Sequence, residues 1–284
     1  MRVLIIGCGA MGSWMARVWK ENVGEVVLCD IDGRKASRVA SRLGVEYVSA
    51  KELEPDADVV MVAVPIPEIP KVLEDIAPKM KKNRLLVDLS SVKERVVDTM
   101  KGLSTDCELA SIHPLFGPGA TTLQGKDVIS VPVRTASVYK RFVRSLESLG
   151  ARVTEMSAED HDKLMAVIQC MTHFVLLGYL SAYESLREFD KRPIRTPLFN
   201  SLFRTAEAML AASPELYGEI QVYNTYSRIV RARLIEACKS LDTMLSAGNL
   251  KSVHEVFEKL REILPQSDVQ DAYKKLYENF EVME

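Results

Sequence analysis

The sequence feature that most constrains the fold is a glycine-rich turn near the N-terminus. Residues Val3–Ile6 form a continuous apolar run typical of a strand buried on both faces. The run leads directly into Gly-Cys-Gly-Ala-Met-Gly at residues 7–12, and apolar residues then recur at helical spacing. A second strand pattern, residues 26–29, ends at Asp30, about 20 residues after the turn. Glycines spaced in this way between a strand and a helix are typical of a dinucleotide-binding unit.

Each glycine of that pattern has a physical role in the prediction. We expect Gly7 to make the tight turn, Gly9 to leave room for a pyrophosphate, and Gly12 to let the helix pack closely on the strand. The free N–H groups at the helix N-terminus attract the phosphates. Asp30 can accept hydrogen bonds from the adenosine ribose and would repel a 2′-phosphate, so the pattern favours NAD over NADP. The nearby Arg34 leaves NADP open.

Strand and helix patterns continue to alternate up to about residue 156. Strands are expected at residues 58–65, 85–89, 109–113, 128–133 and 151–156, with a helix at 137–149. This alternation predicts an α/β, Rossmann-type doubly wound sheet over residues 1–156, whose ligands bind at the carboxyl ends of the strands. The predicted cofactor-binding residues are Gly7, Gly9, Ala10, Met11, Gly12, Asp30, Val64, Pro65 and Ser90.

The second part of the chain, residues 157–284, carries only helical patterns and predicts an all-α domain. A capping box at residues 157–160 begins a helix that is apolar on nearly all sides, so we expect it to be buried in the domain or against a second subunit. Helices follow at residues 197–212 and from Ser213-Pro214 towards Gly248, and two shorter ones finish the chain. Such apolar helices predict a homodimer formed through the helical domain.

Charge and composition exclude several classes of partner. The 284 residues carry a net charge of −2 with a pI near 6.2, which gives no basis for binding nucleic acid or an anionic membrane. No run of about 20 apolar residues stands out as a membrane span, and the N-terminus reads as a strand without a cleavable signal. The five cysteines are scattered, without disulfide or metal-ligand spacing. We therefore expect a cytoplasmic protein without a metal.

His113 is the candidate base. It ends an apolar strand pattern and precedes Pro114, and the Gly-Pro-Gly at residues 117–119 can only form a loop. A lone histidine is most often structural. However, His113 and Ser91 each follow a strand of the predicted sheet, so both lie at the edge that carries the glycine turn. This convergence favours a catalytic role.

These motifs, taken in order, resemble the prephenate dehydrogenase family. The resemblance rests on the glycine turn at residues 7–12, Asp30, Asp-Leu-Ser-Ser-Val-Lys at 88–93, His-Pro-Leu-Phe-Gly-Pro at 113–118, and the helical domain behind them. Members of this family convert prephenate to 4-hydroxyphenylpyruvate with NAD and release carbon dioxide, on the way to tyrosine. Some prefer arogenate and give tyrosine directly. No chorismate mutase or regulatory segment is recognised, so a dehydrogenase alone is expected.

The resemblance implies the site residues. His113 would accept the proton of the substrate's ring hydroxyl, and Ser91 would position the imidazole and approach the nicotinamide. An imidazole must be neutral to act as a base, so activity should fall on the acid side. His173 would face the substrate side chain, with Gln169 one turn before it. Where the family places a carboxylate-binding arginine this chain has Ala208, so Arg204, one turn earlier, is taken as the substrate ligand.

Other functions remain open at this point. A β-hydroxyacid or imine reductase would share the plan but needs a lysine on the first helix of the second domain, where Lys163 is the candidate. A non-catalytic NAD-sensing protein would explain the glycine turn but not the convergence of Ser91 and His113.

Overall fold

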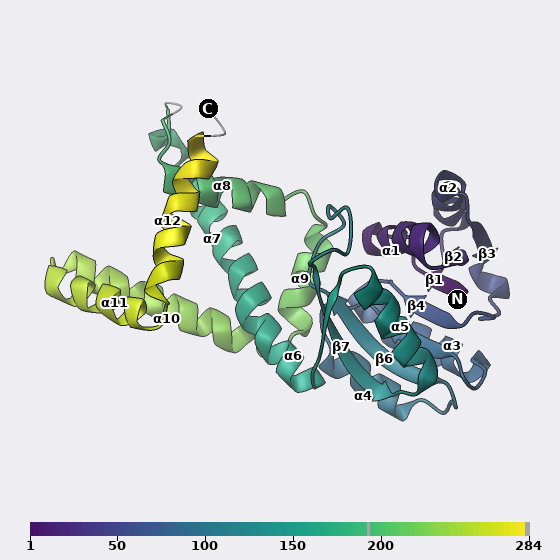
Figure 1. Ribbon diagram of the computed structural model, residues 1–284. Helices are drawn as coiled ribbons and strands as arrows, with labels where there is room; N and C mark the ends of the chain where they lie inside the picture. The colour runs from purple at the N-terminus through teal and green to yellow at the C-terminus, as the bar shows by residue number, and fades with distance from the viewer. Residues whose placement is uncertain (192–193, 282–284) are drawn as a thin grey trace. The chain divides into compact units, whose positions relative to one another are not determined.

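The computed structural model describes residues 1–191 and 194–281 (Figure 1). The chain divides into two compact units, Met1–Met165 and Ala166–Glu284. The predicted change from alternating to helical structure, at residue 156, precedes the boundary of the compact units because the first helix after it, α6 (Ala158–Met165), packs on helix α4 of the first unit.

The first unit is built on one eight-stranded sheet with the order β3-β2-β1-β4-β5-β6-β7-β8. All neighbouring pairs from β3 to β6 are parallel, β7 is antiparallel to β6, and β8 is parallel to β7. The carboxyl ends of β1, β4, β5 and β6 therefore share one edge, which confirms the predicted doubly wound fold. The strands are β1 (Val3–Ile6), β2 (Val26–Asp30), β3 (Glu46–Ser49), β4 (Val59–Val62), β5 (Leu85–Asp88), β6 (Glu108–Pro114), β7 (Asp127–Arg134) and β8 (Arg152–Glu155).

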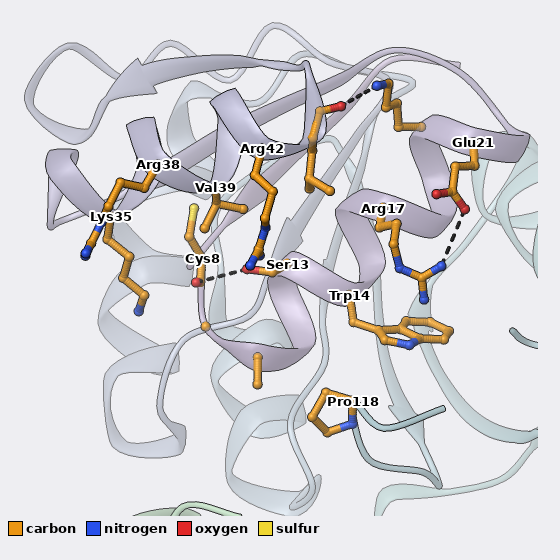
Figure 2. A pocket seen from close by; sticks show the side chains of 14 residues that line it. Cys8, Ser13, Trp14, Arg17, Glu21, Lys35, Arg38, Val39, Arg42 and Pro118 are labelled. Carbon is orange, nitrogen blue, oxygen red and sulfur yellow. Dashed lines mark hydrogen bonds and ion pairs between the residues drawn. The ribbon is translucent and has the colours of Figure 1, made fainter. Parts of the chain in front are cut away.

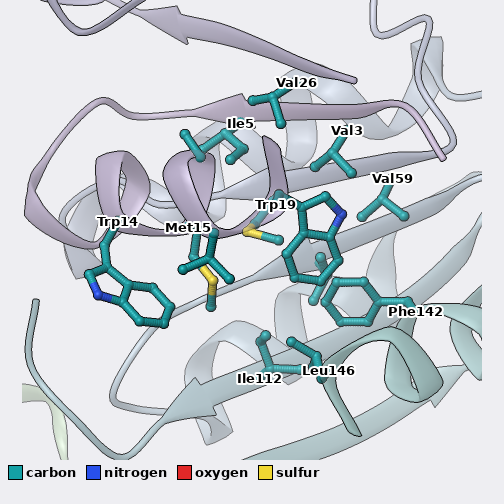
Figure 3. Packing of buried hydrophobic residues seen from close by; sticks show 14 of the residues in the cluster. Val3, Ile5, Trp14, Met15, Trp19, Val26, Val59, Ile112, Phe142 and Leu146 are labelled. Carbon is teal, nitrogen blue, oxygen red and sulfur yellow. The ribbon is translucent and has the colours of Figure 1, made fainter. Parts of the chain in front are cut away.

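Helices cover both faces of this sheet. Alternate residues of β1 divide between two cores, because successive strand side chains point to opposite faces. Val3 and Ile5 pack with Trp19 and Phe142, whose rings stack at 5.4 Å (Figure 3). Leu4 and Ile6 belong to the core under α3 and α4. The helices are α1 (Ala10–Asn22), α2 (Gly33–Leu43), α3 (Ile69–Ile76), α4 (Glu94–Gly102) and α5 (Ser137–Ser148), with short 3-10 turns at Ala50–Glu52, Ile66–Glu68 and Ala77–Lys79.

In the second unit, the regular structure of the described residues is entirely helical. The sequence predicted one helix from Ser213 towards Gly248, but the structure has two, α9 (Pro214–Tyr223) and α10 (Ser227–Ser246). Between them, the buried side chain of Asn224 accepts a hydrogen bond from the backbone N–H of Tyr226. The elements are a π-helix (Ala166–Met171), α7 (Thr172–Ser185), a 3-10 turn (Arg187–Phe189), α8 (Pro197–Met209), α9 (Pro214–Tyr223), α10 (Ser227–Ser246), α11 (Leu250–Glu262) and α12 (Gln266–Glu281).

One helix is long and apolar enough to cross a membrane by length and composition. It runs without a break from Ala158 to Ser185, and most of its apolar window is not buried within the structure. The sequence predicted an apolar helix here, buried in the domain or against a second subunit, but it predicted no apolar run of membrane-spanning length. The exposure of the helix within this chain does not fit burial inside the domain. Its apolar composition fits a helix covered by another protein surface as well as it fits a membrane span. Its exposed apolar side chains are Leu164, Val167, Ile168, Val175 and Leu177.

Candidate functional site

The glycine turn has the geometry of a phosphate site. Gly7 has a φ of +104°, and a Cβ built on it would lie 2.3 Å from the carbonyl oxygen of Ala63. A Cβ on Gly12 would lie 1.9 Å from the carbonyl oxygen of Gly7. A Cβ on Gly9 would meet nothing within 4 Å. Gly7 and Gly12 are thus required by the protein's own packing, whereas Gly9 leaves open space at the N-terminus of α1, where backbone N–H groups can bind an anion.

The carboxylate of Asp30, at the end of β2, holds this turn in place. It accepts hydrogen bonds from the backbone N–H of Cys8 at 2.7 Å and of Asp32 at 2.9 Å, and Lys35 Nζ lies 3.5 Å from it. Each carboxylate oxygen can accept more than one hydrogen bond, so capacity remains for a ribose hydroxyl. Burial, reinforced by the charge of Asp30, raises the pKa of the Cys8 thiol to about 12, so this thiol stays protonated.

A groove of about 1160 Å³ runs along the turn and helices α1 and α2 (Figure 2). Gly9, Ala10 and Ser13 line it at the turn, and Pro118 lines it from the loop after β6. The charged side chains that line it are basic apart from Glu21, which suits a ligand that carries phosphates. The residue named from the sequence, Arg34, is not among the basic groups that line it, which are Arg17, Lys20, Lys35, Arg38 and Arg42.

His113 lies in β6 at the edge of the sheet that carries the glycine turn, and only 3% of it is exposed. Its Nδ1 lies 2.9 Å from Nε2 of His161, which is fully buried on α6. Burial lowers the pKa of His113 well below its ordinary value, and the neighbouring His161 and Lys93 lower it further. Burial also lowers the pKa of His161, although Asp162 opposes this effect. Both imidazoles are therefore neutral at pH 7.

Asp162 connects this histidine pair to the motif at residues 88–93. Its Oδ1 lies 2.7 Å from Nδ1 of His161 and accepts the backbone N–H of Lys93 at 2.8 Å. Its Oδ2 accepts the backbone N–H of Glu94, at the start of α4, at 2.9 Å. The sequence analysis missed His161 and Asp162. The available signal was a His-Asp pair in the first turns of a helix whose later residues are mostly apolar.

The serines of the same motif have different surroundings. Ser90, after β5, donates to Oδ1 of Asp88 at 2.5 Å and lies 2.8 Å from the carbonyl oxygen of Val92, so it fixes the loop. Ser91 is partly exposed at the same sheet edge. The contact that the structure shows for the imidazole of His113 is with His161, not with Ser91.

Two candidate substrate ligands lie in the second unit and have buried polar atoms without partners. Oε1 of Gln169 and Nδ1 of His173 make no hydrogen bond to any residue in the described part of the chain. The imidazole of His173 packs edge-on against the Tyr217 ring at 4.3 Å, and burial lowers its pKa to about 4. Arg204 is exposed on α8. Unsatisfied buried polar atoms are uncommon and point to a ligand or water.

Lys163, the lysine that a β-hydroxyacid reductase would need, is poorly suited to catalysis. Lys163 is exposed on α6 and forms an ion pair with Glu159 at 2.6 Å, one turn earlier. This is an ordinary surface pair along a helix. Within residues 1–191 and 194–281, the His, Cys, Asp and Glu side chains form no cluster of three or more that could hold a metal ion.

Comparisons with known proteins cover nearly the whole chain. A profile of the prephenate dehydrogenase nucleotide-binding domain matches residues 15–155, and a profile of the prephenate dehydrogenase dimerization domain matches residues 157–261. A 4-amino-4-deoxyprephenate dehydrogenase of Streptomyces pristinaespiralis is 29% identical over 275 residues, which are 92% of this chain and 90% of that protein.

Other relatives are longer than this chain. A protein of Methanocaldococcus jannaschii, named as a probable arogenate/prephenate dehydrogenase, is 27% identical over 252 residues, which are 85% of this chain but 56% of that protein. Among solved structures, prephenate dehydrogenase of A. aeolicus with hydroxyphenyl propionate and NAD+ superposes with a TM-score of 0.73 and 20% identity, over 93% of this chain and 98% of that one. This similarity supports the two-part fold.

Proposed function

Because this chain belongs to the prephenate dehydrogenase family, we propose that it catalyses the NAD-dependent oxidative decarboxylation of prephenate to 4-hydroxyphenylpyruvate in tyrosine biosynthesis. The observation that carries the proposal is the buried, neutral His113 at the sheet edge that also holds the glycine turn. A base and a dinucleotide site at one edge are what hydride removal from an alcohol requires.

The first unit, with the nucleotide-binding profile, holds the cofactor in this proposal. The open space at Gly9 and the N-terminus of α1 fit a pyrophosphate, and Asp30 accepts hydrogen bonds from a ribose. When bound, NAD supplies the acceptor for the hydride. The other residues assigned to the cofactor are Gly7, Ala10, Met11, Gly12, Val64, Pro65 and Ser90.

His113 supplies the base. It accepts the proton of the ring hydroxyl as the carbon that bears this hydroxyl is oxidised to a carbonyl. Loss of the ring carboxylate as carbon dioxide then makes the ring aromatic. A positioned base contributes about 10²- to 10⁴-fold to the rate. Ser91, which follows β5 at the same edge, is assigned to the approach of the nicotinamide.

The helical part, residues 157–284, is assigned to the substrate pocket and to dimerisation. Gln169 and His173 each have a buried polar atom without a hydrogen-bond partner among the described residues, which supports their assignment to the substrate. Arg204 is the candidate cation for a substrate carboxylate. The dimerization-domain profile and the exposed apolar side chains of the long helix support a homodimer.

A second candidate substrate, arogenate, is favoured by one observation. Arogenate carries an ammonium group where prephenate carries a ketone. The unpaired Oε1 of Gln169 is a hydrogen-bond acceptor, which suits an ammonium donor better than a ketone.

The test is NADH formation at 340 nm by the purified chain, with prephenate and arogenate offered separately. A signal with either substrate supports the dehydrogenase, and the ratio of the two kcat/KM values identifies the preferred substrate. If NAD binds but neither substrate gives NADH, the fold stands and the proposed reaction is wrong.

A further inference from the structure

We propose that His161 and Asp162 are positioning residues that fix the tautomer of His113 and stabilise the proton that it accepts. The arrangement is a buried chain of three side chains, Asp162–His161–His113, linked by contacts of 2.7 and 2.9 Å. The inference rests on the proposed role of His113 as a base, but its structural part can be tested without turnover.

The tautomers follow from the acceptor at the end of the chain. A carboxylate accepts hydrogen bonds but cannot donate one, so Nδ1 of His161 carries the proton that faces Asp162. A neutral His161 then has a lone pair on Nε2. Nδ1 of His113, 2.9 Å away, must donate to that lone pair. Nε2 of His113 is consequently unprotonated and available as a base.

The same chain stabilises the positive charge that forms on His113. When Nε2 takes the substrate proton, the proton on Nδ1 can pass to Nε2 of His161, so that one N–H bond breaks and another forms. The charge then lies next to the carboxylate of Asp162. This matters because Lys93, whose charge already disfavours a positive His113, is also buried, although Asp88 partly balances it. The carboxylate of Asp162 offsets the new positive charge in this buried site.

Asp162 also has a structural role, since it accepts two backbone N–H groups at the start of α4. Substituting it would therefore disturb folding and function together. His161 is the better position for a test, because its ring nitrogens contact the side chains of His113 and Asp162 rather than the backbone at the start of α4.

The first experiment reads the tautomers directly. The chain has four histidines, so ¹⁵N-histidine labelling gives few ring signals, which single substitutions of each histidine assign. We expect Nδ1 of both His113 and His161 to be protonated and Nε2 of both to be unprotonated at pH 7.5. A protonated Nε2 on His113 would overturn the proposal, whatever the enzyme's activity.

The second experiment compares two variants at position 161. His161→Gln retains an oxygen near the place of Nε2 that can accept from His113, whereas His161→Phe fills the space without an acceptor. We expect His161→Phe to lower kcat by about 10²-fold, within the range for loss of a positioned base, and His161→Gln to restore at least part of this loss. KM and NAD affinity should change little in both.

Equal kcat values for the wild type and both variants would refute the positioning role. If circular dichroism shows that His161→Phe does not fold, the proposal is tested by the kcat of His161→Gln and by the protonated ring nitrogen of His113 in the tautomer spectrum. Failure of the proposed function looks different: the wild type would show the expected tautomers and bind NAD, but would turn over neither prephenate nor arogenate.

Discussion

The ammonium group of Lys93 donates to the carbonyl oxygen of Ile112 at 2.7 Å, directly before His113 in strand β6. Lys93 is fully buried, and its ammonium group also forms an ion pair with Asp88 at 3.5 Å. Burial lowers the pKa of Lys93, while the carboxylates of Asp88 and Asp162 oppose this effect. A cation thus ties the motif at residues 88–93 to the strand that carries the base.

Removing this cation should destabilise the fold. Lys93→Met leaves the buried carboxylate of Asp88 without its charge partner, and breaking a buried ion pair in this way costs about 3–5 kcal/mol. The measurement is the free energy of unfolding in urea. Lys101→Met is the matched control, because Lys101 pairs with Asp98 on the surface and its loss should cost below about 1 kcal/mol. Equal effects of both variants would contradict the assigned contact.

Substituting the base should separate turnover from cofactor binding. His113→Asn is expected to lower kcat by about 10²- to 10⁴-fold, because the positioned base is lost while the glycine turn is untouched. Steady-state kinetics gives kcat, and a fluorescence titration with NADH gives the affinity. The role assigned to His113 is wrong if turnover is unchanged.

The pH dependence should differ from that of an ordinary histidine. Burial holds the pKa of His113 well below its usual value of about 6.5, so the base stays neutral as the pH falls through 6.5. Therefore kcat should remain level from pH 8 to below 6.5 and fall only at more acidic pH. A profile of kcat from pH 5 to 8 measures this. An acid limb centred at or above 6.5 would show that the imidazole titrates as if exposed.

Alanine should weaken NAD binding at Gly9 and lower the stability of the fold at Gly12. Gly9 has a φ of −69° and open space around a Cβ, so Gly9→Ala should leave the melting temperature nearly unchanged. It should nevertheless weaken NAD binding at least about tenfold, which is 1.4 kcal/mol, by filling the space assigned to the pyrophosphate. Gly12→Ala places a methyl group 1.9 Å from the Gly7 carbonyl oxygen and should destabilise the fold by about 1–3 kcal/mol. NAD binding by Gly9→Ala at wild-type strength would contradict the assigned site.

Asp30 should control the choice between NAD and NADP. Asp30→Ala removes the ribose acceptor and frees Lys35, 3.5 Å away, for a 2′-phosphate. We expect NAD affinity to fall about tenfold, the effect of losing a charged hydrogen bond, and the preference over NADP to narrow. Asp32→Ala is the control, because it removes the N-cap of α2 and costs about 1 kcal/mol of stability without touching the ribose. Unaltered NAD affinity in Asp30→Ala would count against the assignment.

Local patterns predicted the parts of the fold that depend on neighbouring residues. The buried strands, the glycine turn and Asp30 are visible because their spacing is set within one strand–helix–strand unit. Strand β3 (Glu46–Ser49) was missed because it is a largely exposed edge strand and has no apolar run. The break at Asn224 was missed because it involves side-chain hydrogen bonding to the backbone, which apolar spacing does not reveal.

The support of the base could not be predicted in the same way. His161 follows His113 by 48 residues and meets it only because α6 folds back onto α4 within the first unit. Sequence spacing carries no information about that packing. Ser91, by contrast, was assigned from the family motif, and its role remains a proposal.

The antiparallel pairing of β6 and β7 has an evolutionary consequence. Because β7 returns beside β6, both ends of the connecting loop, residues 115–126, are anchored at the edge of the sheet that carries the glycine turn. The indole of Trp14 on α1 donates to Ala120 within this loop, and Pro118 lines the groove. Doubling the length of a flexible loop costs only about 0.6 kcal/mol. Insertions that arise here can therefore alter the groove at a small cost in stability, without interrupting strand β6, which carries His113.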